Sequence, residues 1–331
     1  MNRKLLASAV ALLTVSVLAS LVASEWKVAR TPWGEPDLQG TWTSEAELSV
    51  PFERAPAFGT RQLLTDDEFA RRQSQTQTQL QSDNAEFDIE TADISNAGQV
   101  GSATSPPPHW LERGKTSRRT SLVIDPPDGR IPPMTPEALR RIAATARGSF
   151  GNGPFNGPED LGPWERCITR GMPSAIFPTV YNANTRIMQG PGFVAITYEM
   201  IHDTRVIPTD ARPHAGSAIQ QYFGDSRGHW EGDTLVVDVT NFTKKTNYRG
   251  SSDALHLVER FKRADASTLR YEVTVDDSHT WAGPWTAALD LQRQTQSIFE
   301  YACHEGNYGL LNMLRSSRAA DERAAERSPG K

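Results

Sequence analysis

The stretch Leu269-Arg-Tyr-Glu-Val-Thr-Val-Asp-Asp277 alternates apolar and polar side chains over most of its length. Leu269, Tyr271, Val273 and Val275 fall on one face, and the polar side chains between them fall on the other. Successive side chains of a β-strand point to opposite faces, so this period of two indicates a strand with one buried face. The stretch therefore predicts one strand of a half-buried sheet.

Seven other short segments in the second half of the chain have strand-forming composition and are separated by turn signals. They are residues 193–200, 204–208, 219–223, 234–242, 255–263, 286–293 and 298–305. No helical period occurs between them, so sequential antiparallel pairing is the simplest topology. Because closure of a sheet removes its exposed edges, eight such strands predict a mainly β fold, either an antiparallel β-barrel or a strongly curved sheet.

The rest of the chain divides by composition. Arg3 and Lys4 precede an apolar run over 5–22 that ends in small residues, which predicts an export signal over 1–24. The alternative is an uncleaved membrane anchor, which four serine and threonine residues inside the run disfavour. Residues 25–160 predict an irregular wrapping region with short helices, 161–309 the β-barrel region, and 310–331 a charged helix or tail.

Two helices are predicted in the wrapping region from their capping signals. Thr65 followed three residues later by Glu68 is a capping box, and the helix that it opens runs towards Leu80. Thr135 before Pro136 is the start signal of a second helix over 136–147.

Charge and compartment limit the partners. The 331 residues contain 35 Lys and Arg against 40 Asp and Glu, a formal net charge of −5, which disfavours a nucleic-acid partner. With the signal removed, we expect a periplasmic or secreted protein without membrane attachment whose partner is a small molecule. The chain has two cysteines, Cys167 and Cys303, and an oxidising compartment favours a disulfide between them over two separate thiols.

Three polar residues lie on the apolar faces of predicted strands, namely Glu259, Asn241 and Asp277. An unpaired polar group is costly in such a place, so each must be paired or must line a polar cavity. The first alternative is an internal salt bridge, for instance of Glu259 with Arg205 or Arg260. The second alternative is a site at which all three converge, and the three taken together favour it.

Four histidines stand beside carboxylates or at strand ends, namely His202, His214, His256 and His304. A histidine near a carboxylate is a common general acid–base unit at neutral pH. Several histidines together could instead bind a metal, but no ligand spacing such as His-Glu-x-x-His occurs. We therefore expect no metal centre and no cofactor.

These patterns predict an active site in the β region. The predicted catalytic residues are His202, His214, His256, Glu259, Asp277 and His304. The predicted substrate-binding residues are Glu199, Arg205, Asn241, Trp230, Trp281, Trp285 and Tyr301, of which the aromatic ones would form a wall for a ring-bearing ligand. A motif match at Gly224-Asp-Ser-Arg-Gly228 is set aside, because a nucleophile elbow at Ser226 requires a following helix.

Two functions are compatible with this site. The first is an exported lyase, isomerase or hydrolase that acts on a small organic or carbohydrate substrate in a barrel pocket. The second is a non-catalytic β-barrel carrier of a small apolar ligand. A carrier should have an almost uncharged interior, so the charged groups that face the cavity distinguish the two, and Glu259 and Asp277 favour the enzyme.

Five motifs carry a family resemblance over nearly the whole mature chain. They are Pro36-Asp-Leu-Gln-Gly-Thr-Trp42, Glu199-Met-Ile-His-Asp-Thr-Arg205, the run from Gly224 to Asp238, Leu255-His-Leu-Val-Glu-Arg-Phe261 and Tyr301-Ala-Cys-His-Glu-Gly-Asn307. With them the chain resembles a group of exported bacterial proteins, which implies export and a single architectural unit but no particular chemistry. Gly40-Thr-Trp42 is also similar to the Gly-x-Trp that opens lipocalin barrels, which implies a lipocalin-like sheet.

Overall fold

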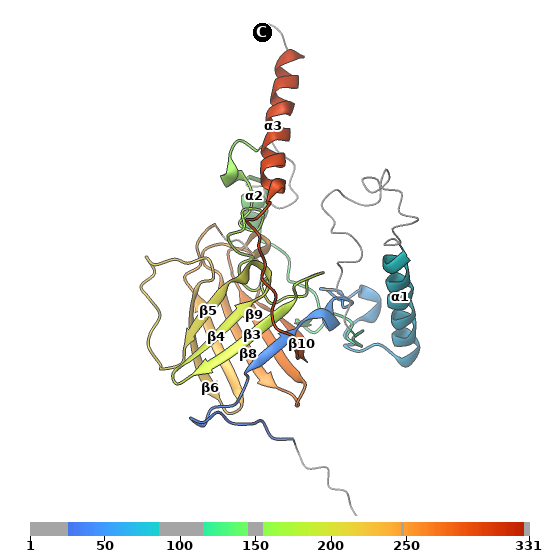
Figure 1. Cartoon of the computed structure of the whole chain (residues 1–331), viewed down its shortest axis with the longest axis vertical. Helices are drawn as coiled ribbons and strands as arrows, with labels where there is room; N and C mark the ends of the chain where they lie inside the picture. The colour runs from blue at the N-terminus through green and yellow to red at the C-terminus, as the bar shows by residue number, and fades with distance from the viewer. Residues whose placement is uncertain (1–25, 86–114, 145–154, 246–247, 328–331) are drawn as a thin grey trace, which may run out of the picture.

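A ten-stranded antiparallel sheet forms the body of the molecule in the computed structural model, which describes residues 26–85, 115–144, 155–245 and 248–327 (Figure 1). The strands are β1 (Gly40–Thr43), β2 (Val123–Asp125), β3 (Asn184–Gly190), β4 (Phe193–Tyr198), β5 (Thr204–Pro208), β6 (Asp225–Glu231), β7 (Thr234–Thr240), β8 (His256–Arg263), β9 (Thr268–Asp276) and β10 (Trp285–Gln294). The predicted export signal and much of the polar stretch before 114 lie outside the described residues.

The sheet is strongly curved, as predicted, but the barrel is not closed. Its order is β5-β4-β3-β1-β10-β9-β8-β7-β6, with β2 paired to β10 beside this path. All eight pairings along the path are antiparallel, so its first and ninth strands, β5 and β6, run in the same direction. An antiparallel ladder between them is therefore impossible, and no parallel ladder joins them either, so the curved sheet keeps a seam between β5 and β6 among the described residues.

The two edge strands approach most closely at Gly228. A Cβ atom on this glycine would lie 3.0 Å from the side chains of both Ile207 and Thr209, so a larger residue would push β5 and β6 apart. Its backbone angle is not in the left-handed region, so the close approach explains the glycine better than its conformational freedom does.

The inner face of the sheet forms the hydrophobic core. Leu269, Tyr271, Val273 and Val275 are completely buried, which confirms the inner face predicted for this strand. The guanidinium groups of two arginines lie over the buried Trp42 ring, where cation–π attraction adds to packing. They belong to Arg263 and Arg293, at 4.8 and 5.6 Å from the ring centroid.

Two predicted strands are wrong. Residues 219–223 make only one bridge, between Gln221 and Phe242, because this part of the chain crosses from one sheet edge to the other. Residues 298–305 form no strand either: Phe299 is 66% exposed and has no buried face to contribute. Side-chain contacts and a disulfide hold this second segment instead of a ladder.

Three strands were not expected from the sequence. β1 lies in the middle of the sheet between β3 and β10, so the N-terminal region contributes to the sheet as well as wrapping it. β3 contains few apolar residues. The sequence of β6 is typical of a turn, because its inward positions include Ser226 and Gly228. Small inward residues suit a strand whose edge approaches another edge, but they remove the hydrophobic signal of a strand.

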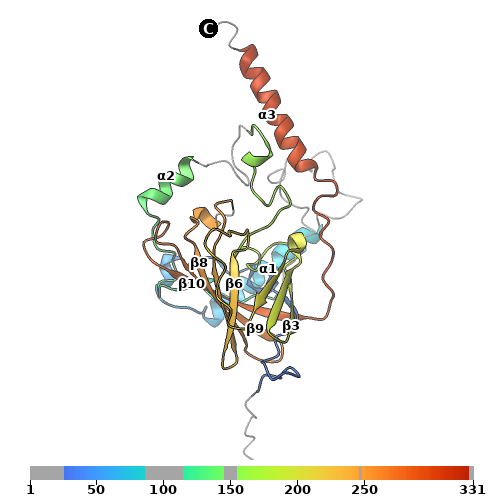
Figure 2. The ribbon, with the colours of Figure 1, turned by 90° about the vertical axis from the view of Figure 1, so that its left-hand side faces the viewer.

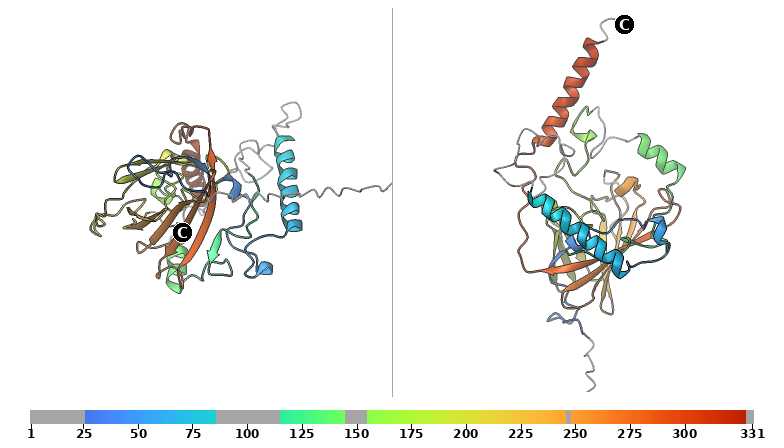
Figure 3. Two further views of the ribbon diagram at one scale, coloured as in Figure 1. Left: turned by 90° about the horizontal axis from the view of Figure 1, so that it is seen from below. Right: turned by 90° about the vertical axis from the view of Figure 1, so that its right-hand side faces the viewer.

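The helices lie outside the sheet. The α-helices of the described residues are α1 (Asp66–Ala85), α2 (Pro136–Ala144) and α3 (Tyr308–Glu326). Short 3-10 helices also occur, at Glu45–Glu47, Pro56–Phe58, Pro158–Asp160, Met200–His202 and Tyr248–Gly250. α1 stands apart from the sheet and α3 projects away from it (Figures 2 and 3). Thr65 and Glu68 form the predicted capping box, and the Ala138 N–H donates to Thr135 as expected. Within the described ranges, every helix is too short or too polar to cross a bilayer.

We expect Gly228→Val to lower the free energy of unfolding by about 1–3 kcal/mol, because it overpacks the contact between β5 and β6. Urea unfolding measures the change. Gly283→Val is the matched control, since a Cβ at Gly283 meets no atom within 4 Å. Equal stability of the two variants would contradict the close approach of the edge strands.

Candidate functional site

A cavity of about 560 Å³ opens at the seam between β5 and β6. Its polar walls include Thr169, Asp203, Arg205, Asp225, Ser226 and Arg227, and its aromatic side chains are Tyr222 and Phe223. Four of these residues carry formal charges, so the cavity is a polar site at the open edge of the sheet. We call it the seam cavity.

A buried ion pair lies beneath the seam cavity. Arg205 Nη1 donates to Glu259 Oε2 at 2.5 Å, and Nη2 donates to Oε1 at 3.1 Å. The Tyr271 hydroxyl also donates to Glu259 Oε1, at 3.0 Å. Glu259 is fully buried, and this pair confirms the predicted salt bridge with Arg205, whereas Arg260 points to the outer face and pairs with Glu231.

Arg205 stays charged although it is buried. Burial lowers the pKa of Arg205, but the charge and hydrogen bonds of Glu259 together with Tyr198 and Tyr271 outweigh it and raise the pKa, so the guanidinium stays protonated. Burial also raises the pKa of the neighbouring Tyr198 hydroxyl. Within the described residues, Arg205 Nε and the Tyr198 hydroxyl have no hydrogen-bond partner. The interior next to the cavity therefore holds unused polar atoms as well as a complete ion pair.

Asp203 forms one wall of the cavity at the end of a strained turn. The two residues that precede Asp203, Ile201 and His202, have φ angles of 65° and 46°. This left-handed conformation is unfavourable for a β-branched isoleucine. His202 Nδ1 lies 2.9 Å from the Tyr301 carbonyl oxygen, which holds this turn in place. Burial raises the pKa of Asp203 above its ordinary value, although Thr169 and His202 oppose the change.

Asp225 also lines the cavity, and its pKa is shifted in the opposite direction. Its Oδ2 accepts hydrogen bonds from the Ala215 N–H and His214 Nδ1 at 2.8 and 2.9 Å, and its Oδ1 accepts one from Arg227 at 2.6 Å. Burial alone would raise the pKa of Asp225, but these hydrogen bonds and the charges of Arg227 and His214 lower it. A carboxylate has about four acceptor sites, so one site on Oδ1 stays available.

Two of the predicted catalytic histidines share one carboxylate on the outer face of the sheet. His214 Nε2 lies 2.8 Å from Asp238 Oδ1, and His256 Nε2 lies 2.7 Å from Asp238 Oδ2. Because His214 also contacts Asp225, the chain of contacts runs from the cavity wall to His256. In the described part of the chain, no group of three or more His, Cys, Asp or Glu side chains is arranged to hold a metal ion.

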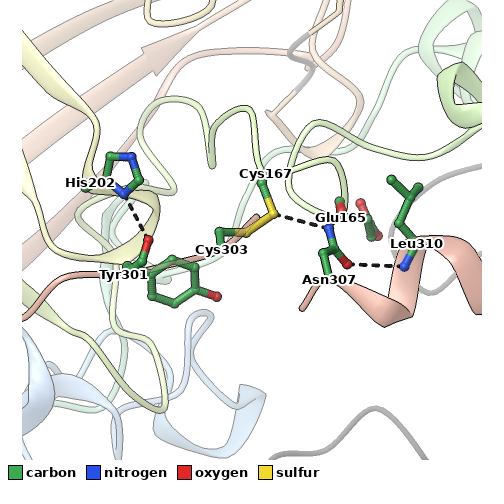
Figure 4. Close-up of a disulfide and its surroundings, with 7 residues drawn as sticks. All are labelled: Glu165, Cys167, His202, Tyr301, Cys303, Asn307 and Leu310. Atoms are coloured by element: carbon green, nitrogen blue, oxygen red, sulfur yellow. Dashed lines mark hydrogen bonds between the residues drawn. A yellow bond between two sulfur atoms is a disulfide. The ribbon is translucent and has the colours of Figure 1, made fainter. Parts of the chain in front are cut away.

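The predicted disulfide between Cys167 and Cys303 is confirmed, with Cα atoms 5.7 Å apart (Figure 4). Asn307 supports it: its Nδ2 donates to Cys167 Sγ and to the Glu165 carbonyl, and its Oδ1 caps α3 through the Leu310 N–H. The next two residues after Cys167 line the seam cavity. The disulfide therefore fixes one wall of the site to the end of the chain.

The other predicted polar residues do not converge on this site. Asp277 is buried in a loop cap, where it accepts hydrogen bonds from Ser252 and Thr280. Asn241 follows the end of β7 and donates to the Ala215 carbonyl, so it does not face the interior. Glu199 is buried, and its carboxylate accepts hydrogen bonds from Asn184 Nδ2 and from the Phe299 N–H. Glu259, Asn241 and Asp277 thus have separate partners, and they form no common cavity.

The remaining predicted residues are also apart from the cavity. His304 is exposed beside the disulfide. Trp281 and Trp285 are buried in an edge-to-face pair within the core, and Trp230 is packed against the core. Tyr301 is stacked on Tyr181 with ring centroids 6.5 Å apart. These rings stabilise the fold, and the cavity uses Tyr222 and Phe223 instead.

Sequence reasoning missed both carboxylates of the cavity. Asp203 lies in Glu199-Met-Ile-His-Asp-Thr-Arg205, and Asp225 lies in the run after Gly224, both of which are quoted above for the resemblance. The available signal was a polar residue at the boundary of a strand in each motif. Ser226 lies on β6, with no helix after it, so the context that a nucleophile elbow requires is absent.

Comparison of the chain with protein-family models, with curated proteins and with solved structures found no match in any of the three. The resemblance to exported bacterial proteins therefore stays a prediction, and the site is interpreted from its geometry.

We expect Glu259→Gln to lower the free energy of unfolding by about 3–5 kcal/mol, because it leaves the Arg205 guanidinium buried without a counter-charge. Replacing both partners, with Arg205→Met and Glu259→Leu, should recover most of this loss. Chemical denaturation measures both. Glu231→Gln, in the exposed pair with Arg260, should change stability little because solvent screens that pair. A loss of less than about 1 kcal/mol for Glu259→Gln would contradict the buried pair.

We expect replacement of both cysteines by serine to lower the free energy of unfolding by about 2–5 kcal/mol. Amide hydrogen exchange should also speed up at Ile168 and Thr169, which the disulfide holds in the cavity wall. The exposed hairpin between β6 and β7 serves as the internal reference. Two reactive thiols in the unfolded, unreduced wild-type chain would show that the disulfide does not form.

Proposed function

We propose that this protein is an enzyme that uses acid–base chemistry on a small, uncharged polar substrate, such as a carbohydrate, bound in the seam cavity. The observation that carries the proposal is that two carboxyl groups whose pKa values are shifted in opposite directions line one cavity, Asp203 and Asp225. Pairs of titratable groups whose surroundings push their pKa values apart are the usual acid and base of such enzymes.

In this proposal Asp203 is the general acid. A carboxyl group with a raised pKa keeps its proton to a higher pH than an ordinary aspartate does, and it can deliver that proton to a leaving oxygen as the bond to that oxygen breaks. Asp225 is the ionised partner, and its free site on Oδ1 can accept the proton of an attacking water or stabilise positive charge on the substrate. This division of roles is that of two-carboxylate hydrolases and lyases.

The charges of the lining favour an uncharged substrate. Arg205 is neutralised by Glu259, and Arg227 is neutralised by Asp225. The raised pKa of Asp203 reduces its charge over a wider pH range than that of an ordinary aspartate, and whenever Asp203 is protonated neither an anion nor a cation meets an unpaired opposite charge in the cavity. Hydroxyl groups suit these paired donors and acceptors, and the rings of Tyr222 and Phe223 suit the C–H faces of a sugar.

The alternative function, a carrier of an apolar ligand, gains no support from this lining. The cavity carries four charged side chains, whereas an apolar ligand would require an almost uncharged wall. Export to the periplasm or the outside is part of the proposal and is supported by the disulfide, because disulfides persist in oxidising compartments.

The test uses a panel of neutral mono- and disaccharides and their 4-nitrophenyl glycosides. Saturation-transfer NMR measures binding to the wild-type protein, and release of 4-nitrophenol measures turnover. We expect Asp203→Asn to lower kcat on the disaccharides, followed by release of the monosaccharide, by about 10²–10⁴-fold while binding changes little, because the leaving sugar oxygen has lost its proton donor and the cavity remains. Turnover of the 4-nitrophenyl glycosides should change less, because 4-nitrophenol can leave as its anion. Asp210→Asn is the control, since Asp210 is exposed and pairs with Arg212 outside the cavity.

Three outcomes would overturn parts of the proposal. Unchanged turnover in Asp203→Asn would remove Asp203 as the acid. Binding without turnover by the wild-type protein would indicate a carbohydrate-binding protein and not an enzyme. Absence of both for the whole panel would reject the carbohydrate class.

A further inference from the structure

The connection between β5 and β6 is fastened to the outer face of the sheet over a short segment, 213–215. The Ala215 N–H donates to Asp225 at 2.8 Å, and Asn241 Nδ2 donates to the Ala215 carbonyl at 2.9 Å. Arg227 Nε donates to the Pro213 carbonyl at 2.8 Å. His214, in the middle of this segment, adds two contacts of its own.

Each ring nitrogen of His214 faces a carboxylate oxygen. Nδ1 lies 2.9 Å from Asp225, and Nε2 lies 2.8 Å from Asp238. An ionised carboxylate only accepts hydrogen bonds, and a neutral imidazole has only one N–H. Both contacts can therefore be hydrogen bonds to ionised carboxylates only when His214 carries a proton on each nitrogen, which is the imidazolium form.

Charged groups face His214 and its neighbour His256 from several strands. From β6, His214 faces Asp225 together with its partner Arg227, and from β7 it faces Asp238. From β8, His256 approaches the other oxygen of Asp238, and its register partner on β9 is Asp276. Within the connection itself, Arg212 is already engaged by Asp210. Three carboxylates thus stand around His214 and His256, with one guanidinium among them.

The segment that His214 fastens belongs to the cavity wall. The same connection continues into residues 220–223, which line the seam cavity, and Asp225 contributes one oxygen to His214 while it borders the cavity. We propose that His214 is a proton-dependent latch of the seam cavity. As an imidazolium it holds the connection and Asp225 in place, and when it loses its proton the segment is released. The latch rests on the proposed function only for its effect on turnover.

The direction with pH follows from the two partners. As pH rises and His214 loses a proton, one of its two contacts becomes a repulsion between acceptors, so the latch opens on the alkaline side. On the acid side the latch fails when Asp225 is protonated. The lowered pKa of Asp225 moves this failure below the usual value of 3.8, so the latch is closed in the mildly acidic range between these limits.

Two measurements on the full mature chain test the latch without a substrate. Nitrogen-15 NMR of the histidine rings should show His214 protonated on both nitrogens at pH 6. Hydrogen exchange of residues 213–223, expressed relative to the unfolded-chain rate at each pH, should lose about tenfold protection or more once His214 is deprotonated. A neutral ring at pH 6, or protection that is independent of pH, would overturn the proposal.

Two variants sharpen the test. His214→Gln should show low protection of the same segment at every pH. The glutamine amide carries both of its N–H groups on one nitrogen, so it cannot reach the two carboxylates that the two ring nitrogens of histidine face. His229→Gln is the matched control, since His229 on β6 makes a single exposed contact with Glu231 and should behave as the wild type does. If His214→Gln fails to fold, the wild-type titration still decides the question.

These outcomes separate the latch from the proposed function. Loss of the latch signal with intact sugar turnover would reject the latch alone. A working latch in a protein that neither binds nor turns over the sugar panel would reject the proposed substrate class alone. If both hold, turnover should decline with the same midpoint as the protection of residues 213–223.

Discussion

The buried pair of Arg205 and Glu259 connects β5, at one edge of the curved sheet, to β8 across the interior. β5 and β6 run in the same direction, so the antiparallel ladder stops at both strands. Arg205 reaches from β5 across the interior to Glu259 on β8 and holds the curvature without a backbone ladder. Breaking either partner leaves an uncompensated charge in the core, so this pair constrains the seam more strongly than exposed ion pairs do.

The inner faces of the long strands were predictable because each depends only on a local period of two. That period placed Tyr271 and Glu259 inside and left a salt bridge with Arg205 as an alternative. β6 was not predictable, because the approach of β5 demands small inward residues such as Gly228. The closeness of the two edges depends on how far the whole sheet curls, and no local pattern carries that information.

The candidate site was predictable in its residue types and not in its place. His214 and His256 were expected as acid–base groups, and they do meet, through Asp238 on the outer face. The raised pKa of Asp203 could not be inferred, because it comes from burial by a wall that is distant in sequence. The inward polar residues were expected to converge on one site. They do not, because Asp277 accepts hydrogen bonds within its own loop.

The open seam explains why the strained residues gather where they do. A ladder between β5 and β6 would satisfy the strand edges but would fill the space in which Asp203 and Asp225 face the cavity. Contacts outside the strand ladders hold the walls of the cavity instead. The disulfide fixes Cys167, with a φ of 55°, and the contact with Tyr301 fixes His202, with a φ of 46°. Left-handed residues persist only where their surroundings determine them, so these external ties allow the seam to remain open as a defined cavity.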